Sequence, residues 1–218
     1  AGGSREPISR RILVSAGELS GDQLGAGLVT APRSRDPGLE FFGLVGPEMR
    51  ASGVSEVAQV ESLSVMGVGE VLGRLGGILR TRAAMLQALD DGAELLVVID
   101  APDFNLPLAR AARKKDIPVI FYVSPHVWAW RSGRAREIAS IAAGILCLFE
   151  FEPAWYTCWG GSASFVGHPA AEIQREEKDG HGWALLPGSR PQEIQRLLPI
   201  LLQVGQVLRQ EDPAVPLR

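Results

Sequence analysis

Short apolar runs, separated by glycine-rich or charged segments, recur along most of the chain. Runs of this kind, bounded by turn residues, are typical of strands buried on both faces of a parallel sheet. Helical spacing of apolar residues follows most of them, which predicts the alternating strand and helix order of an α/β fold. The predicted strands cover residues 11–16, 39–45, 95–99, 117–123, 144–149 and 163–166.

Helices are predicted between these strands. The first starts in the sequence GELSGDQLGAG and is expected to end near Ala31, because Pro32 and Pro37 follow. Strand, glycine-rich turn and helix in this order are the opening of a Rossmann-like unit. Further helices are expected at residues 47–52, 106–115 and 152–159.

Residues 64–89 carry a helical pattern of a second kind. The polar positions from Arg74 to Arg82 are basic without an acid, and Gly69, Gly73, Gly76 and Gly77 interrupt the helical pattern. The pattern alone favours a helix packed on the sheet. Each glycine costs about 1 kcal/mol in a helix interior relative to alanine, whereas a basic apolar segment lying in a lipid interface tolerates glycine. Both interpretations stay open; the apolar positions concerned include Val68, Val71, Leu72, Leu75, Ile78 and Leu79.

Composition changes at residues 171–182, where charge and glycine replace the apolar runs. We interpret this segment as a linker between a lobe at residues 8–170 and a second unit at 183–218. The second unit again predicts a strand at 183–186, a turn at 188–190 and a helix at 192–209. The expected fold is a Rossmann-like parallel sheet with helices on both faces, followed by an incomplete second lobe.

Charge and cysteine usage exclude several functions. The net charge of −3 gives no general attraction to nucleic acid. No window approaches the roughly 18 uninterrupted apolar residues of a membrane span. Cys147 and Cys158 lack CxxC spacing, and the histidines lack metal-ligand spacing. We therefore expect no metal site, and a reducing, cytoplasmic compartment.

Two carboxylates follow the strand at 95–99, in the sequence LLVVIDAPDFN. The carboxyl end of a parallel strand opens on the ligand crevice of an α/β sheet, so Asp100 and Asp103 are candidates for chemistry. The alternative is that both merely cap the next helix. Glu18 and Asp22 in the first turn would repel a phosphate but suit sugar hydroxyls. Capping by Ser20 and Asp22 is the alternative there.

Two further turns carry arginine. Arg131 follows the strand at 117–123 and is a candidate clamp for a phosphate or carboxylate. Trp128 and Trp130, in the same segment, are expected in the core. The turn from Gly188 to Arg190 contains no acid, which suits a diphosphate.

Six motifs, taken together and in order, resemble the lipid-A-disaccharide synthase family. They are GELSGD (17–22), VMG (65–67), IDAPDFN (99–105), YVSPHVWAWR (122–131), FVGHP (165–169) and LLPGSR (185–190). The resemblance implies a two-lobed, GT-B type, inverting glycosyltransferase without metal or other cofactor. It also implies UDP-2,3-diacylglucosamine as donor, 2,3-diacylglucosamine 1-phosphate as acceptor, lipid A disaccharide 1-phosphate and UDP as products, and a peripheral seat on the cytoplasmic side of the inner membrane.

The resemblance also implies roles for individual residues. Asp100 matches the proposed general base, and residues 68–79 match a lipid-inserting segment. Asp103 is then expected to be a turn or helix-capping residue that holds Asp100 in place. Gly188, Ser189 and Arg190 match the turn that faces the donor phosphates. The implied substrate-binding residues are Glu18, Ser20, Asp22, Asp103, Asn105, Ser124, Arg131 and His168.

The chain departs from the family in length. Family members continue well beyond the position of Arg218, so we expect a truncated donor lobe and no activity of the isolated chain. Two alternatives remain: a non-catalytic half that binds the acceptor or the membrane, and a protein like a sugar-nucleotide epimerase. A homodimer is a further expectation.

Overall fold

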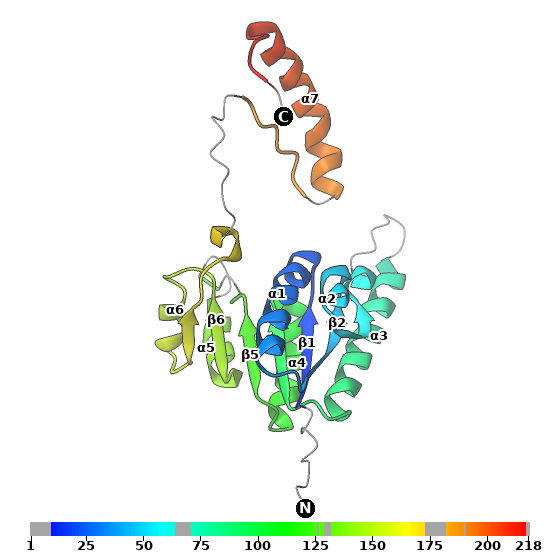
Figure 1. Cartoon of the computed structure of the whole chain (residues 1–218), viewed down its shortest axis with the longest axis vertical. Helices are drawn as coiled ribbons and strands as arrows, with labels where there is room; N and C mark the ends of the chain where they lie inside the picture. Colours follow the sequence, from blue (N-terminus) through cyan, green and yellow to red (C-terminus); the bar gives the residue numbers. More distant parts are fainter. Residues whose placement is uncertain are drawn as a thin grey trace, which may run out of the picture. The chain divides into compact units, whose positions relative to one another are not determined.

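The computed structural model describes residues 10–63, 71–125, 127–128, 132–172, 182–189 and 191–216. The chain divides into two units, Ala1–Glu172 and Ile173–Arg218. Figure 1 labels most of their helices and strands.

A parallel sheet forms the centre of the first unit. Its described residues make seven strands in the order β3-β2-β1-β4-β5-β6-β7, and all neighbouring pairs are parallel (Figure 1). Strands β2 and β3 therefore extend the sheet on one side of β1, and strands β4 to β7 extend it on the other side. The strands are β1 (Arg10–Ala16), β2 (Leu39–Val45), β3 (Ser55–Gln59), β4 (Leu95–Ile99), β5 (Val119–Tyr122), β6 (Gly144–Cys147) and β7 (Ala163–Phe165).

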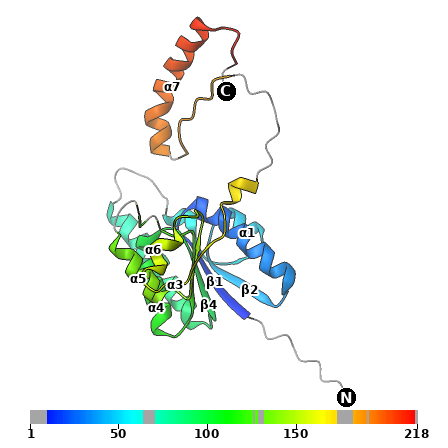
Figure 2. The same cartoon turned by 90° about the vertical axis from the view of Figure 1, so that its left-hand side faces the viewer.

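Helices cover both faces of this sheet. Helix α1 lies on one face, and α3, α4 and α5 lie on the other (Figure 2). This arrangement confirms the predicted Rossmann-like parallel sheet with helices on both faces. The helices of the unit are α1 (Leu19–Arg35), α2 (Pro47–Ala51), α3 (Val71–Asp90), α4 (Pro102–Lys114), α5 (Gly133–Ile141) and α6 (Pro153–Thr157), with 3-10 turns η1 (Val60–Leu63) and η2 (Pro169–Glu172).

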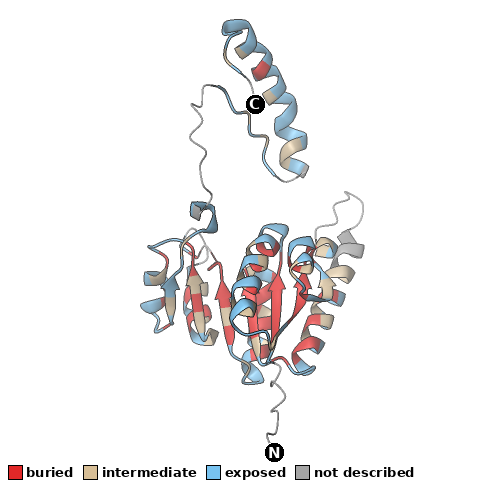
Figure 3. Ribbon diagram, in the orientation of Figure 1, coloured by how far each residue is buried: buried red, intermediate tan, exposed pale blue. Residues whose placement is uncertain are grey.

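The core follows the central strands. Most residues of β1 and β4 are buried, as the near-continuous red of these strands in Figure 3 shows. Such strands need apolar residues at successive positions because both of their faces are covered by helices. Leu13, Leu96 and Ile99 are fully buried at the middle of this core.

Several predicted element boundaries are wrong. Pro32 lies inside α1, which continues to Arg35. Proline removes one backbone hydrogen bond, but the carbonyl of Pro32 still accepts the N–H of Asp36 at 2.9 Å, so the last turn closes. Helix α4 begins at Pro102 and not near Leu106. Proline is favoured in the first turn, where its missing N–H has no intrahelical partner.

Two predictions about strands are also wrong. Strand β3 was not expected, because its sequence SEVAQ is polar; as an edge strand it has half-exposed and exposed residues only. The predicted strand at 183–186 does not form in the described residues. Trp183 makes one backbone hydrogen bond, to the carbonyl of Pro216 at 3.0 Å, and a strand requires a ladder of such bonds.

The second unit contains one long helix among its described residues, α7 (Pro191–Glu211), with Pro199 inside it. Much of its apolar surface is open to solvent, and it appears mostly pale blue in Figure 3. The exposed large apolar side chains of α7 are Leu197, Leu198, Ile200, Leu202, Val204 and Val207.

Candidate functional site

The sheet has its topological switch point between β1 and β4. Neighbouring strands whose chain connections leave in opposite directions open a crevice at their carboxyl ends, where ligands of α/β proteins bind. Ala16 pairs with Ile99 at this end, so the turns that follow β1 and β4 lie side by side. Glu18 and Asp100 therefore lie at the same edge of the sheet, where such a crevice is expected.

Gly17 allows the two turns to approach each other. A Cβ atom added at Gly17 would lie only 2.0 Å from the Cβ of Ala101. No larger residue fits at position 17 without moving the turn after β4. The glycine in the first turn thus serves close packing of the crevice wall.

The turn after β4 has an unusual backbone. Asp100 and Ala101 both have positive φ angles, 49° and 44°. The left-handed conformation costs L-residues other than glycine roughly 1–2 kcal/mol each. Such strain persists only where the surroundings hold it, and it concentrates at functional sites. This turn leaves Asp100 half-buried at the crevice and starts α4 at Pro102.

Asn105 lies directly under this turn and is completely buried. Its Oδ1 accepts the Ser15 hydroxyl at 2.6 Å. Its Nδ2 donates to the carbonyl of Asp100 at 2.8 Å and, at 3.3 Å each, to the carbonyls of Ile99 and Ser15. Every polar atom of this amide is engaged, so the structure corrects the expectation that Asn105 contacts substrate.

Asp22 is likewise buried and engaged. Its carboxylate accepts the backbone N–H groups of Gly46 at 2.7 Å, Glu48 at 2.8 Å and Met49 at 3.2 Å. These amides form the N-terminus of α2, where unsatisfied donors favour an anion. Asp22 is therefore a cap across the fold, and the expectation that it binds substrate is corrected. The alternative interpretation as a cap is the better one, although the capped helix is α2 and not α1.

Glu18 and Ser20 remain at the surface. Glu18 is the N-cap residue of α1 with extended backbone, and its side chain does not cap the helix. Both residues are exposed at the crevice end of β1. Of the three polar residues predicted in the first turn, these two are accessible to a ligand.

Asp103 projects to solvent from the first turn of α4, and its carboxylate is 70% exposed. The N-cap position of α4 is Ala101, without a side-chain cap, so the expected capping role of Asp103 is wrong. Its Oδ1 accepts a hydrogen bond from Nη2 of Arg134 at 2.5 Å, and its backbone carbonyl accepts one from Nη2 of Arg82 at 3.3 Å. Asp103 thus joins α4 to α5 and α3.

The end of β5 forms the next wall. Val123 has a φ of 64°, a strained value for a β-branched residue. Ser124 is buried near the Cys147 thiol and the Tyr156 hydroxyl, yet its Oγ has no hydrogen-bond partner of normal geometry among the described residues. Arg131 lies outside the described residues, as does Trp130. Trp128 is 40% exposed, which corrects its expected core position.

Glu152 organises the buried groups behind this wall. Its Oε2 accepts the N–H groups of Leu148 and Phe149 at 3.1 Å each, and its Oε1 accepts the Trp128 indole N–H at 3.3 Å. Burial raises the pKa of the Cys147 thiol to about 11. Burial likewise raises the pKa of the Tyr156 hydroxyl, which donates to the carbonyl of Pro125 at 2.9 Å. Neither group ionises near neutral pH.

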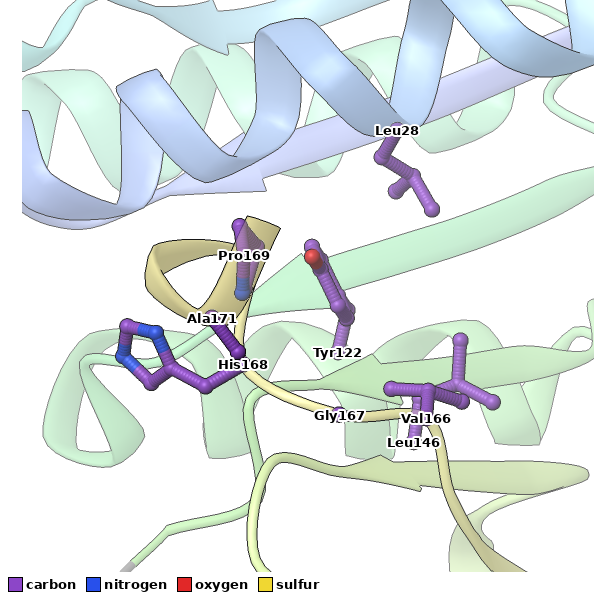
Figure 4. Close-up of a pocket in the computed structure, with 8 residues that line it drawn as sticks. All are labelled: Leu28, Tyr122, Leu146, Val166, Gly167, His168, Pro169 and Ala171. Carbon is purple, nitrogen blue, oxygen red and sulfur yellow. The ribbon is translucent and has the colours of Figure 1, made fainter. Parts of the chain in front are cut away.

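His168 follows β7 and lines an apolar pocket of about 360 Å³ on the α1 face of the sheet (Figure 4). Leu28 and Tyr122 face this space, whereas the His168 ring points away from them (Figure 4). The His168 Nδ1 accepts the backbone N–H of Ala170 at 3.0 Å. Asp100 is not one of the residues that line this pocket, although its backbone N–H donates to the carbonyl of Tyr122, which does, at 3.3 Å. The lining residues of the pocket are Leu28, Tyr122, Leu146, Val166, Gly167, His168, Pro169 and Ala171.

The predicted lipid-inserting segment is only partly described. Val68 lies outside the described residues, and for Val71, Leu72 and Leu75 only the helical backbone of α3 is described. Leu79 is 59% exposed, whereas Ile78 is partly buried against the core. No helix among the described residues is both long and apolar enough to cross a membrane.

In the second unit, a carboxylate lies at the predicted phosphate turn. Gly188 has a φ of 90°, which suits glycine. The N–H of Ser189 donates to Oε2 of Glu193 at 3.2 Å, so an acid from the following helix reaches a turn that contains none in its own sequence. The glutamate comes from the first turn of α7, where negative charge complements the helix N-terminus. Arg190 lies outside the described residues.

Three residues that support the site were not predicted: Ser15, Arg134 and Glu152. A serine in the apolar run RILVSA is a signal, because a buried hydroxyl needs a partner. Arg134 and Glu152 carry no comparable signal. Among the described residues, no cluster of three or more histidine, cysteine or acidic side chains could hold a metal ion.

The fold is shared with glycosyltransferases. The crystal structure of the glycotransferase of kitacinnamycin superimposes with a TM-score of 0.53 at 14% sequence identity, over 92% of this chain and 62% of that one. This likeness concerns the fold alone. It agrees with the predicted lobe of a GT-B fold.

Sequence comparison is more specific. The family model described as lipid-A-disaccharide synthetase matches residues 12–218. A lipid-A-disaccharide synthase of Geobacter sulfurreducens is 40% identical over 96% of this chain and 58% of its own length. One from Neisseria meningitidis is 42% identical over 93% of this chain and 56% of its own length. The chain belongs to the lipid-A-disaccharide synthase family, and it spans less than two thirds of the length of these relatives.

Proposed function

We propose that this chain provides the acceptor-binding and base-bearing lobe for the transfer of a diacylglucosamine unit from UDP to a second diacylglucosamine. The donor would be UDP-2,3-diacylglucosamine, the acceptor 2,3-diacylglucosamine 1-phosphate, and the products lipid A disaccharide 1-phosphate and UDP. The observation that carries this proposal is the placement of Asp100, in a chain of this family, on a strained turn at the switch point of the sheet.

Asp100 would act as the general base. As the acceptor 6-hydroxyl attacks the anomeric carbon of the donor, its proton passes to the Asp100 carboxylate while the bond to UDP breaks. A carboxylate is a weak base near neutral pH, but the departure of UDP makes the sugar carbon cationic before much proton transfer is needed. Correct placement of the carboxylate then matters more than its basicity.

The accessible residues around the crevice would bind the sugars. Glu18 and Ser20 are exposed beside Asp100 and can accept or donate hydrogen bonds to hydroxyl groups. Arg131 would hold the acceptor phosphate from the neighbouring segment. Ser124, Asp103 and His168 are less direct candidates: Ser124 is buried, Asp103 is paired with Arg134, and the His168 ring points away from its pocket.

The donor diphosphate would bind at Gly188, Ser189 and Arg190 of the second unit, where the positive charge of Arg190 and the backbone amides would stabilise the leaving UDP. Phosphate binding there requires Glu193 to leave the Ser189 amide. The chain matches only 56 to 58% of the length of the two relatives. We therefore propose that transfer also requires the part of the relatives that this chain does not match, and that the 218-residue chain alone forms no disaccharide.

The same proposal includes the membrane. Residues 68–79 would insert apolar side chains into the cytoplasmic surface of the inner membrane, where each buried methylene contributes roughly 0.8 kcal/mol. The exposure of Leu79 and of the neighbouring Arg80 supports such an orientation for the described end of this segment. Basic residues there would face the anionic lipid headgroups.

The decisive experiment measures disaccharide formation from radiolabelled acceptor by a chain completed to the length of its relatives. We expect Asp100→Asn to lower kcat by at least about 100-fold, since removal of a general base typically costs 10²–10⁴-fold. Asp103→Asn is the matched control, because it makes the same change three residues away in the first turn of α4. This variant is expected to retain most activity. An inactive Asp103→Asn together with an active Asp100→Asn would reverse the assignment.

A second candidate is a non-catalytic half that binds acceptor or membrane. The exposed apolar side chains of α7 favour it, because they suit a surface that another polypeptide covers. A chain completed to the length of its relatives distinguishes the two candidates. Disaccharide formed by the completed chain, and lost in its Asp100→Asn variant, would contradict the binding-only function.

A further inference from the structure

The turn at Asp100 and Ala101 needs an external support. Two successive non-glycine residues with positive φ do not persist by local preference, because the Cβ atom approaches the following carbonyl in this conformation. Backbone hydrogen bonds contribute: the carbonyl of Ala101 accepts the N–H groups of Phe104 and Asn105 at 3.0 Å each. These bonds start α4, but they leave the Asp100 peptide itself unfixed on its carbonyl side.

Asn105 supplies that contact. Its Nδ2 donates at 2.8 Å to the carbonyl of Asp100, the peptide that joins the two left-handed residues. The same nitrogen reaches the carbonyls of Ile99 at the end of β4 and Ser15 near the end of β1. One buried amide thus holds both strands of the switch point and the turn between β4 and α4.

The groups around Asn105 fix which way its amide faces. The Ser15 hydroxyl lies 2.6 Å from Asn105 Oδ1, and the three carbonyls surround Nδ2. An amide turned by 180° would place Oδ1 against three carbonyl oxygens, which repel it. The hydroxyl and the carbonyls therefore agree on a single orientation.

We propose that Asn105 is a positioning residue that holds the left-handed turn at Asp100 and Ala101 and so aims the Asp100 carboxylate into the crevice. This inference rests on the proposed role of Asp100 as general base. Asn105 is completely buried and touches no substrate; it acts through the backbone of Asp100. Removal of the amide releases the turn, and the carboxylate then moves away from the acceptor hydroxyl.

The test combines a structural and a kinetic measurement on Asn105→Ala. In the 218-residue chain, the crystal structure or NMR couplings report the sign of φ at residues 100 and 101, which we expect to become negative. In a chain completed to the length of the relatives, kcat is expected to fall by about 100-fold with little change in KM, as for a misplacement of about 1 Å.

Adding Ala101→Gly provides the rescue. Glycine adopts positive φ without a steric cost, so the double variant should regain the turn and about tenfold of the lost kcat. A purely structural role of Asn105 in the core would not be relieved by a glycine on the surface side of the turn. Loss of kcat without rescue would therefore overturn the proposal, as would a left-handed turn and normal kcat in Asn105→Ala.

Two controls complete the series. Thr81→Val removes a buried hydroxyl of α3 that lies 3.3 Å from Ser62 Oγ, and it should leave kcat unchanged. If Asn105→Ala does not fold, Asn105→Ser decides: it keeps a hydrogen-bonding group in the core but is too short to replace the contact of Nδ2 with the Asp100 carbonyl. Its kcat should fall by about 100-fold, whereas unchanged kcat would overturn the proposal. An active Asp100→Asn would refute the general base, while the φ measurement would still decide whether Asn105 holds the turn.

Discussion

Individual polar residues divide into those that meet solvent at the crevice and those that hold its walls. Asp22, Asn105 and Glu152 are buried, and each satisfies two or more backbone groups. A buried polar group without a partner costs free energy, so these side chains are placed where the backbone has donors or acceptors to spare. They build the crevice without entering it.

Asp22→Ala should destabilise the fold. The substitution leaves the backbone donors of Gly46, Glu48 and Met49 without their anion, and we expect the free energy of unfolding to fall by about 2 kcal/mol. Urea denaturation followed by circular dichroism measures the change. Ser20→Ala, an exposed neighbour, should stay within about 0.5 kcal/mol of the wild type. Equal stability of the two variants would show that Asp22 does not cap α2.

Cys147 should make the fold sensitive to alkali. Because burial raises the pKa of this thiol from about 9 to about 11, the unfolded chain releases the proton at lower pH than the folded one. The contribution to stability is complete below pH 9 and is lost as the pH rises through 11, up to about 2 kcal/mol. The slope of melting temperature against pH should therefore be shallower in Cys147→Ala than in the unsubstituted chain, and an equal slope would contradict this role of the buried thiol.

At the scale of elements, α1 and β4 approach closely through glycines. A Cβ added at Gly25 would lie 2.6 Å from the sulfur of Met49 and 2.9 Å from Cδ1 of Ile99, whereas one at Gly27 meets nothing within 4 Å. Both glycines occupy the same helix, two residues apart. Gly25 is needed for close packing, whereas Gly27 only lowers the stability of the helix. The two positions therefore allow these effects to be measured separately.

Gly25→Ala and Gly27→Ala should change stability in opposite directions. Overpacking at position 25 is expected to lower the free energy of unfolding by about 1–3 kcal/mol. Alanine at position 27 is expected to raise it by about 0.5–1 kcal/mol, because alanine favours the helix over glycine. Thermal unfolding of both variants measures the difference. A stabilised Gly25→Ala would mean that α1 can shift away from β4 at no cost.

At the scale of the whole molecule, the hydrophobic core belongs to one unit. In the part of the chain that the structure describes, every buried residue of the core cluster lies between Ile12 and Tyr156, within Ala1–Glu172. The described part of the second unit has one long helix with a largely exposed apolar surface. The first unit is thus stabilised by a buried apolar core, whereas the described part of the second unit buries little apolar surface.

A chain that ends at Glu172 should unfold as one cooperative domain, because it contains the complete sheet and its core. Thermal denaturation followed by near- and far-ultraviolet circular dichroism should give coincident transitions. A residue 173–218 fragment, by contrast, should show no cooperative transition, since a single helix buries too little apolar surface. A non-cooperative sheet domain would mean that residues after Glu172 belong to its core.

The sequence alone predicted the parallel sheet, the placement of Asp100 after its central strand and the family. Apolar runs carry this information because strands buried on both faces need apolar residues at successive positions. The edge strand β3 and the start of α4 escaped prediction, because an exposed edge tolerates polar residues and because proline permits both a turn and a first helical residue.

Only the tertiary structure decided which polar residues face the crevice. In sequence, Asp22 and Asn105 resemble Glu18 and Asp100, since all four follow strands at the same edge of the sheet. Their roles separate only when backbone groups of other segments come near: the amides at the N-terminus of α2 reach Asp22, and the carbonyls of β1 and β4 reach Asn105. Those partners are distant in the chain, so local pattern cannot reveal them. The fold brings these partners to Asp22 and Asn105, and it leaves Asp100 half-buried at the carboxyl edge of the sheet.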